Sequence, residues 1–95
     1  MSRPIWRIPI RGVSFAIKWV KMRGKLGECS SPRGAHPTIR LHPDLRDDDR
    51  QLMAIAAHEV LHAADWDKDE EAIDEMEDAL VKVLYDVLGY RRTET

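Results

Sequence analysis

Apolar and polar residues alternate in the first half of the chain and recur at helical spacing in the second half. Within residues 13–22, Phe15, Ile17 and Trp19 occupy every second position. A period of two predicts a β-strand with one face toward a core.

Three further segments are expected to be extended, namely 5–9, 26–29 and 38–42. The turn-forming residues of 30–37 predict a loop before the last of them. That last strand stops at Pro43, and proline cannot donate a hydrogen bond to a strand ladder. We therefore expect 38–42 to be an edge strand.

Two helices are predicted in the second half, over 47–64 and 69–88. Aspartates begin both and suit helix N-caps, and apolar residues cover most of the first helix, which we expect to be largely buried. The second helix has an apolar stripe that we expect to face the core and a stop at Gly89. The stripe comprises Ile73, Met76, Leu80, Val83, Leu84, Val87 and Leu88.

These elements predict an α+β fold in which a small antiparallel sheet of about three strands packs on two helices. The chain of 95 residues has room for a single domain, 1–95, with strands mainly in 1–43 and a frayed tail at 91–95.

Charge and cysteine content narrow the functional classes. The formal net charge of −2 argues against broad electrostatic binding to nucleic acid or to an anionic membrane, so neither partner is expected. The basic first half is interpreted as a solvated strand face turned toward an acidic helix, and a basic patch that contacts nucleic acid is the alternative. The lone Cys29 cannot form an internal disulfide, and no segment has signal or membrane-span length. The expected location is the cytoplasm, which is that of the host cell if the chain is phage-encoded.

The segment His58-Glu59-Val60-Leu61-His62 carries the strongest chemical signal. Residues four apart lie on one face of a helix, so both histidines can hold one metal ion from consecutive turns. Zinc favours imidazole ligands, and Glu59 can reach a water molecule at the metal without being a ligand. The alternative is two helix histidines satisfied by hydrogen bonds alone.

The motif and its flanks, from Ala57 to Ala63, resemble the active-site helix of the zincin metallopeptidases. The order of elements over 38–90 resembles the small phage- and prophage-type members. This resemblance implies Zn²⁺, with His58 and His62 as ligands and Glu59 as the general base.

The third ligand is sought among the acidic residues that follow the motif. The metzincin pattern is absent, because Asp65 and Lys68 stand where it needs glycine and histidine or aspartate. Gluzincins take a glutamate from the next helix, supported by an aspartate four residues later, and Glu70 and Asp74 match that pattern.

Helical spacing gives a second test of the third ligand. It places Glu70 at the border of the apolar stripe, Asp69 on the stripe and Glu77 near it, while Glu71 points to the opposite side. Glu70 is the first candidate, and Asp69, Glu71 and Glu77 remain open.

The predicted function is a zinc-dependent metallopeptidase that hydrolyses peptide bonds with a metal-activated water. Glu59 would take the proton, and an extended peptide or protein substrate would pair with the strand at 38–42. Two alternatives remain: a catalytically inactive, metal-stabilised regulatory or virion-associated binding protein, and a zinc-independent helical interaction module.

Other residues have structural interpretations. His36 and His42 are expected at the surface, and Cys29 is expected to be a small buried side chain. The tryptophans are expected in the core or at its border. They are Trp6, Trp19 and Trp66.

Overall fold

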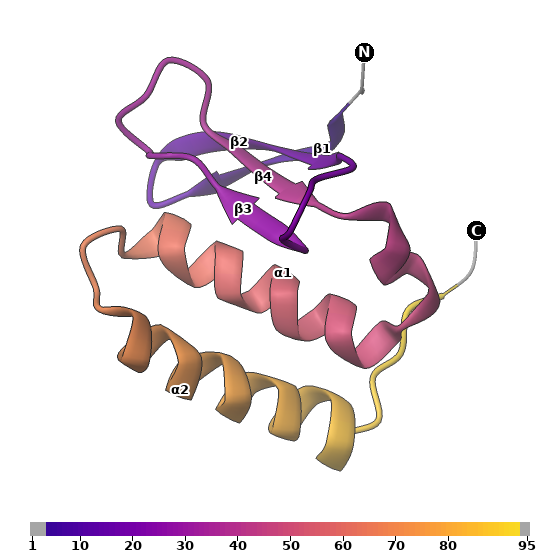
Figure 1. The fold of residues 1–95 in the computed structure, drawn as a ribbon. Coiled ribbons are helices and arrows are strands. Elements are labelled where there is room, and N and C mark those ends of the chain that lie inside the picture. Colours follow the sequence, from indigo (N-terminus) through magenta and orange to yellow (C-terminus); the bar gives the residue numbers. More distant parts are fainter. Residues whose placement is uncertain (1–3, 94–95) are drawn as a thin grey trace.

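The computed structural model describes residues 4–93 and has an α+β fold, as predicted (Figure 1). The strands are β1 (Pro4–Ile10), β2 (Val13–Trp19), β3 (Gly27–Cys29) and β4 (Thr38–Leu41). A 3₁₀ turn, Pro43–Asp47, leads into α1 (Asp49–Ala64). Helix α2 (Glu70–Val81) continues as a π-helical segment, Lys82–Val87.

The sheet has four strands in the order β1-β2-β4-β3 and is mixed rather than wholly antiparallel. β1 and β2 form a hairpin whose turn residues, Arg11 and Gly12, both have positive φ, of 50° and 81°. Such turns match the natural twist of paired strands. β4 then inserts between β2, to which it is parallel, and β3, to which it is antiparallel.

The prediction that 38–42 forms an edge strand is therefore wrong. Pro43 lies just beyond the last paired residue of β4, so its missing N–H removes no ladder hydrogen bond. The sheet edges are β1 and the short strand β3.

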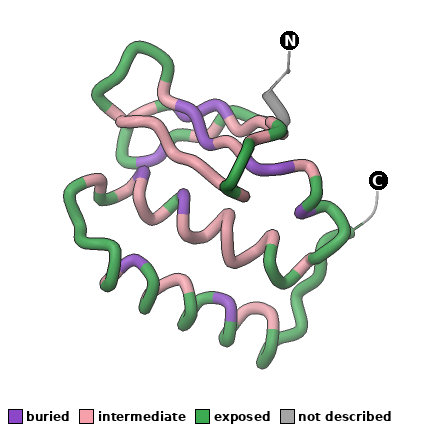
Figure 2. The backbone as a smooth tube through the Cα atoms, viewed as in Figure 1, coloured by how far each residue is buried: buried purple, intermediate pink, exposed green. Residues whose placement is uncertain are grey.

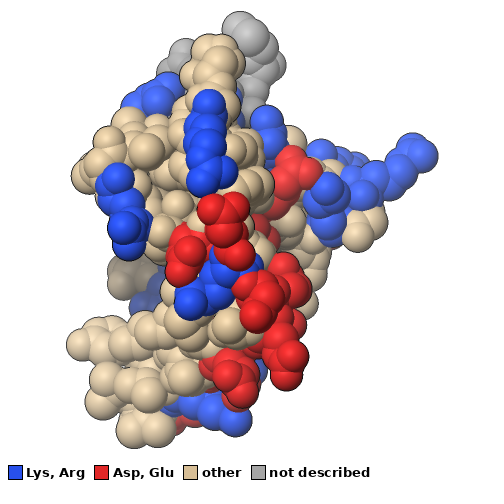
Figure 3. All heavy atoms as spheres, turned by 90° about the vertical axis from the view of Figure 1, so that its left-hand side faces the viewer, with Lys and Arg blue, Asp and Glu red and all other residues tan. Residues whose placement is uncertain are grey.

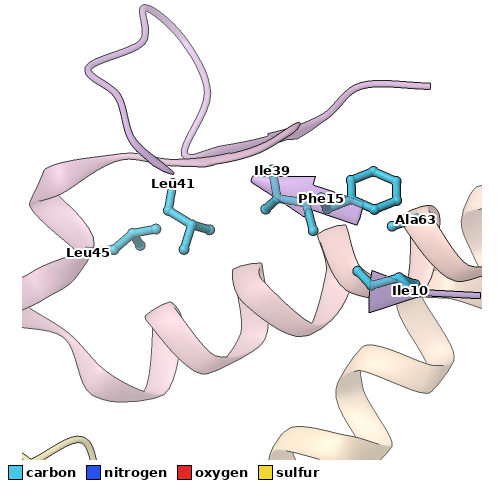
Figure 4. Close-up of a cluster of buried hydrophobic side chains, with 6 residues drawn as sticks. All are labelled: Ile10, Phe15, Ile39, Leu41, Leu45 and Ala63. Carbon is cyan, nitrogen blue, oxygen red and sulfur yellow. The ribbon is translucent and has the colours of Figure 1, made fainter. Parts of the chain in front are cut away.

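Helix α1 is the middle of three layers, with the sheet on one side and α2 on the other (Figures 1 and 2). One face of the sheet packs on α1 and forms the main core (Figure 4). The buried residues of this core are Ile10, Phe15, Ile39, Leu41, Leu45 and Ala63. Most α1 residues are only partly buried, so this helix is less enclosed than predicted.

Fewer residues of the apolar stripe of the second helix are buried than predicted. Ile73 and Val81 are buried, whereas Leu80, Val83 and Val87 are 39%, 52% and 76% exposed. The reason is that α2 packs on α1, and among residues 4–93 no second element of that size packs against it. Gly89, with φ of 76°, follows the helical segment as predicted.

Three smaller expectations also change. Trp6 is 68% exposed rather than at the core border. His42 is buried, and its Nδ1 accepts a hydrogen bond from the backbone N–H of Asp44 at 3.1 Å, which caps the 3₁₀ turn. Of the predicted tail 91–95, residues 94–95 lie outside the described part of the chain, and Arg91 and Arg92 lie over Tyr85 and Trp19.

Within residues 4–93, no helix is both long and apolar enough to cross a membrane.

Candidate metal centre

A short reversal of the chain brings the start of α2 against the end of α1 (Figure 1). The backbone N–H of Asp65 donates to Leu61 O and that of Lys68 donates to Asp65 O, which forms the turn. Asp69 then caps α2 by accepting a hydrogen bond from Ala72 N at 2.8 Å. This reversal places the first turn of α2 opposite the motif histidines.

Three side chains meet at this point. His58 Nε2 lies 3.0 Å from His62 Nε2, because both residues project from consecutive turns of α1. The carboxylate of Glu70 spans the two rings, with Oε1 2.7 Å from His58 Nε2 and Oε2 3.1 Å from His62 Nε2. The structure therefore brings together both predicted histidine ligands and the first candidate for the third.

This donor set fits a zinc ion in kind and in spacing. Two imidazole nitrogens and one carboxylate are a common set of three zinc ligands. In a tetrahedral site with bonds of about 2.0–2.1 Å, donor atoms lie about 3.3 Å apart. Here the two imidazole nitrogens lie 3.0 Å apart, and they contact different oxygens of the Glu70 carboxylate at 2.7 and 3.1 Å, so these three side chains are close enough to share one ion.

The second ring nitrogen of His58, Nδ1, faces carboxylates of α2, which orient the ring. Its Nδ1 lies 2.9 Å from Glu77 Oε1 and 3.4 Å from Asp74 Oδ1. An Nδ1–H that donates to a carboxylate leaves Nε2 with a free lone pair directed at Glu70 and His62, which is the form of histidine that binds a metal. Glu77 therefore lies on the opposite edge of the His58 ring from Glu70.

None of the other three candidates for the third ligand contacts both histidines as Glu70 does. The carboxylate of Asp69 is engaged as the cap of α2. Glu71 is exposed, in agreement with the spacing that places it on the outer side of the helix. Glu77 reaches His58 but belongs to a second group, with Asp74, around Nδ1.

Glu59 is the buried acid of the site, with only 7% of its surface exposed. Burial raises the pKa of its carboxyl group, while the nearby His58 and His62 act in the opposite direction. The side chain projects from α1 toward β3, where a Cβ added to Gly27 would lie 2.9 Å from Glu59 Oε2 and would also collide with Ile55. The absence of a side chain at Gly27 therefore lets the edge strand approach the motif helix.

An open cleft of about 460 Å³ gives access to these groups. It lies between β3 and the turn that joins the helices, and Lys68 is the one cation among its lining residues. Trp66 forms part of the wall and packs edge-on against the ring of His62, with ring centres 6.4 Å apart. The lining residues are Glu28, Cys29, His58, Glu59, His62, Trp66, Lys68 and Glu70.

Sequence reasoning did not assign Gly27, Trp66 or Lys68 to this site. A glycine inside a strand is a known signal of close backbone approach, so Gly27 could have been singled out. No sequence pattern marks Trp66 or Lys68 in this way. They line the cleft because of the conformation of the turn between α1 and α2. Cys29 is half-buried, and burial raises the pKa of its thiol to about 12, so it is not an activated nucleophile.

Comparison with known proteins does not identify the chain: no protein family, no curated protein and no solved structure matches it.

Proposed function

We propose that this protein is a zinc-dependent peptidase whose metal ligands are His58, His62 and Glu70. The observation that carries the proposal is the convergence of two imidazole nitrogens, 3.0 Å apart, on the two oxygens of one carboxylate, at 2.7 and 3.1 Å, beside a buried glutamate and an open cleft. A zinc ion held there would lower the pKa of a water molecule and polarise a peptide carbonyl.

Glu59 would act on the proton of that water. Glu59 follows His58 directly in α1 and lines the same cleft, but it does not belong to the cluster of His58, His62 and Glu70. A carboxylate in this place can accept the proton during attack and return it to the leaving amine. Its shielding from solvent favours proton exchange with the substrate over exchange with bulk water.

The substrate would lie along β3 rather than along 38–42. β4 is paired on both sides, whereas β3 is a terminal strand of the sheet and contributes Glu28 and Cys29 to the cleft wall. An extended peptide can add to such a free edge through backbone hydrogen bonds, which would hold its peptide bond across the cleft. Lys68 and Trp66 then lie on the far side of the cleft from this edge.

The test is hydrolysis of unfolded, fluorophore-labelled casein by zinc-reconstituted protein. Wild type is expected to cleave it, and Glu59→Gln is expected to keep its zinc and lose at least about a hundredfold in rate. Glu75→Gln is the control, because Glu75 is exposed on the outer side of α2. Loss of zinc from Glu59→Gln, or an unchanged rate, would contradict the role of Glu59.

A second candidate is a metal-stabilised binding protein without turnover. The apolar residues left exposed on the last turns of the helical hairpin favour it, since such groups mark interaction surfaces. They are Leu80, Val83, Val87, Leu88 and Tyr90. Full zinc occupancy with no cleavage of any unfolded substrate would favour this candidate.

A further inference from the structure

In the described part of the chain, both helices lie on one side of the sheet, and no helix covers the face turned away from α1 (Figure 1). Strand register places Arg7, Ala16 and Thr38 side by side on β1, β2 and β4, and it places Lys18 beside Arg40. These positions alternate with the core residues Phe15 and Ile39, which face α1. Lys18 and Arg40 therefore lie side by side on the outer face, and Arg7 lies diagonally across from Lys18, level with Ala16 two residues away.

Apart from Arg33, which pairs with Asp67 in the turn between the helices at 3.1 Å, the described cations of residues 4–43 form no ion pair with the helical half. Residues 4–43 contain eight Lys and Arg residues and a single acid, Glu28. Figure 3, viewed from the end where the helices join, shows most Lys and Arg over the sheet and most Asp and Glu over the helices. The interpretation of a basic strand face turned toward an acidic helix is wrong, because both helices lie on the other side of the sheet.

Two of the outer-face cations are free of ion pairs. Arg40 Nη1 pairs with Glu28 Oε1 at 2.9 Å, whereas Arg7 and Lys18 form no ion pair with any residue among 4–93. Unpaired cations on neighbouring strands repel one another, so this face favours an anion that bridges them.

These two cations line a hollow of about 270 Å³ in the outer face. The loop before β4 forms one wall, through His36, and Ser14 adds a hydroxyl to the floor. None of the described residues that line the hollow is acidic. Two cations, a hydroxyl and an imidazole around a small polar hollow are the groups that recognise a phosphate.

We propose that this face binds the phosphodiester backbone of a nucleic acid, with one phosphate in the hollow beside Arg7 and Lys18. Arg7, Lys18 and Arg40 lie on adjacent strands about 4.8 Å apart, so they offer positive charge to neighbouring phosphates of one backbone. Because binding is through phosphates, it carries little preference for base sequence.

The character of the face favours nucleic acid over an acidic protein. A protein partner needs apolar or aromatic anchors at the centre of its interface. The large exposed hydrophobic residues among those described lie elsewhere: Trp6 shares the α1 side of β1 with Ile8, and the others belong to the helical half. Charge alone holds a partner here, and nucleic acid presents the densest array of negative charge.

The experiment measures fluorescence anisotropy of a short labelled DNA duplex with the full chain, in the presence of a chelator so that the zinc site plays no part. Wild type is expected to bind, and the logarithm of its binding constant is expected to fall with the logarithm of salt concentration with a slope of about −2 to −3. Lys18→Gln and Arg7→Gln are each expected to weaken binding about 3–10-fold and to flatten the slope by about 0.9.

Lys82→Gln is the control, since it removes the same charge from the start of the π-helical segment, where Lys82 pairs with Asp78 of α2 at 2.8 Å. It is expected to leave binding unchanged. An equal loss in Lys82→Gln, no salt-dependent binding by wild type, or competition by poly-glutamate as strong as that by unlabelled DNA would each overturn the proposal. None of these outcomes bears on the zinc site, so the two proposals stand or fall separately.

Discussion

Helix α1 packs against the sheet on one face and against α2 on the other, and the two contacts are built from different chemistry. The sheet side is apolar apart from Glu59 beside β3, with Phe15, Ile39 and Leu41 buried together (Figure 4). The α2 side buries Ile73 and Val81 beside a cluster of ionisable groups. That cluster is His58, His62, Glu70, Asp74 and Glu77.

The two sides of α1 therefore differ in what stabilises them. Apolar burial stabilises the sheet and α1 under all solution conditions in which the chain folds. The cluster between the helices gathers three carboxylates, whose mutual repulsion favours a bound cation. We therefore expect the sheet and α1 to form a rigid frame, and α2 to depend on occupation of the metal site.

The largest expected effect is on the apolar side. Phe15 is fully buried, so Phe15→Ala should lower the free energy of unfolding by about 3–5 kcal/mol. Leu80→Ala, at a residue that is 39% exposed on α2, is the control and should cost about 1 kcal/mol or less. Urea denaturation measures both, and equal losses would show that the sheet core is not the main source of stability.

Removal of the metal by a chelator should weaken the contact between α1 and α2. Metal at about a hundredfold excess over its Kd would add about 2.7 kcal/mol to stability, and that contribution disappears with a chelator. Hydrogen exchange followed by mass spectrometry should then show faster exchange in α2, with β2 and β4 little changed. Uniform acceleration over the whole chain would contradict the division into a frame and a dependent helix.

A smaller effect is expected from the carboxylate that orients His58. Glu77→Gln keeps the size of the side chain but weakens the contact with Nδ1, now 2.9 Å. Such orienting partners are typically worth 10–100-fold in metal affinity, and a loss of that order is expected by isothermal titration with zinc. Glu75→Gln, on the exposed side of the same helix, should bind zinc as wild type does.

The smallest effect concerns an exposed clasp between the start of α1 and the end of the helical hairpin. Arg50 donates twice to Asp86, at 3.1 and 2.8 Å, and these hydrogen bonds lower the pKa of Asp86 below its ordinary value of 3.8. The clasp contributes fully above that ordinary value and is lost as the pH falls through the lowered pKa.

Asp86→Asn should therefore lower Tm slightly at neutral pH and make the loss of stability below pH 3.8 less steep. Thermal melts of both proteins with a chelator over the acid range measure this difference. Parallel Tm curves for wild type and variant would show that the clasp does not contribute in solution.

Much of this architecture follows from local sequence patterns. Alternation predicts β2, the aspartates predict where the helices begin, and the spacing of His58 and His62 places their rings on one side of α1. The meeting of these rings with Glu70 follows from a short turn between two helices, although its role as a ligand stays a prediction. The cap formed by Asp69 was also predicted and is confirmed.

Other features depend on contacts between distant segments and could not be read from local patterns. The insertion of β4 between β2 and β3 is a choice of strand order, and neither Pro43 nor the alternation in 38–41 encodes it. The exposure of Leu80, Val83 and Val87 depends on how many neighbours α2 has. The approach of Gly27 to Glu59 requires both the strand order and the tilt of α1.

The zinc site proposed at His58, His62 and Glu70 can be tested by measuring the metal content of the purified protein. Wild type purified without added metal should contain about one zinc per chain by elemental analysis. Glu70→Ala should lose most of it, and Glu71→Ala, an exposed neighbour on α2, should retain it. No zinc in wild type, even after zinc is added to the folded protein, would contradict the account, and equal zinc content in both variants would exclude Glu70 as the third ligand.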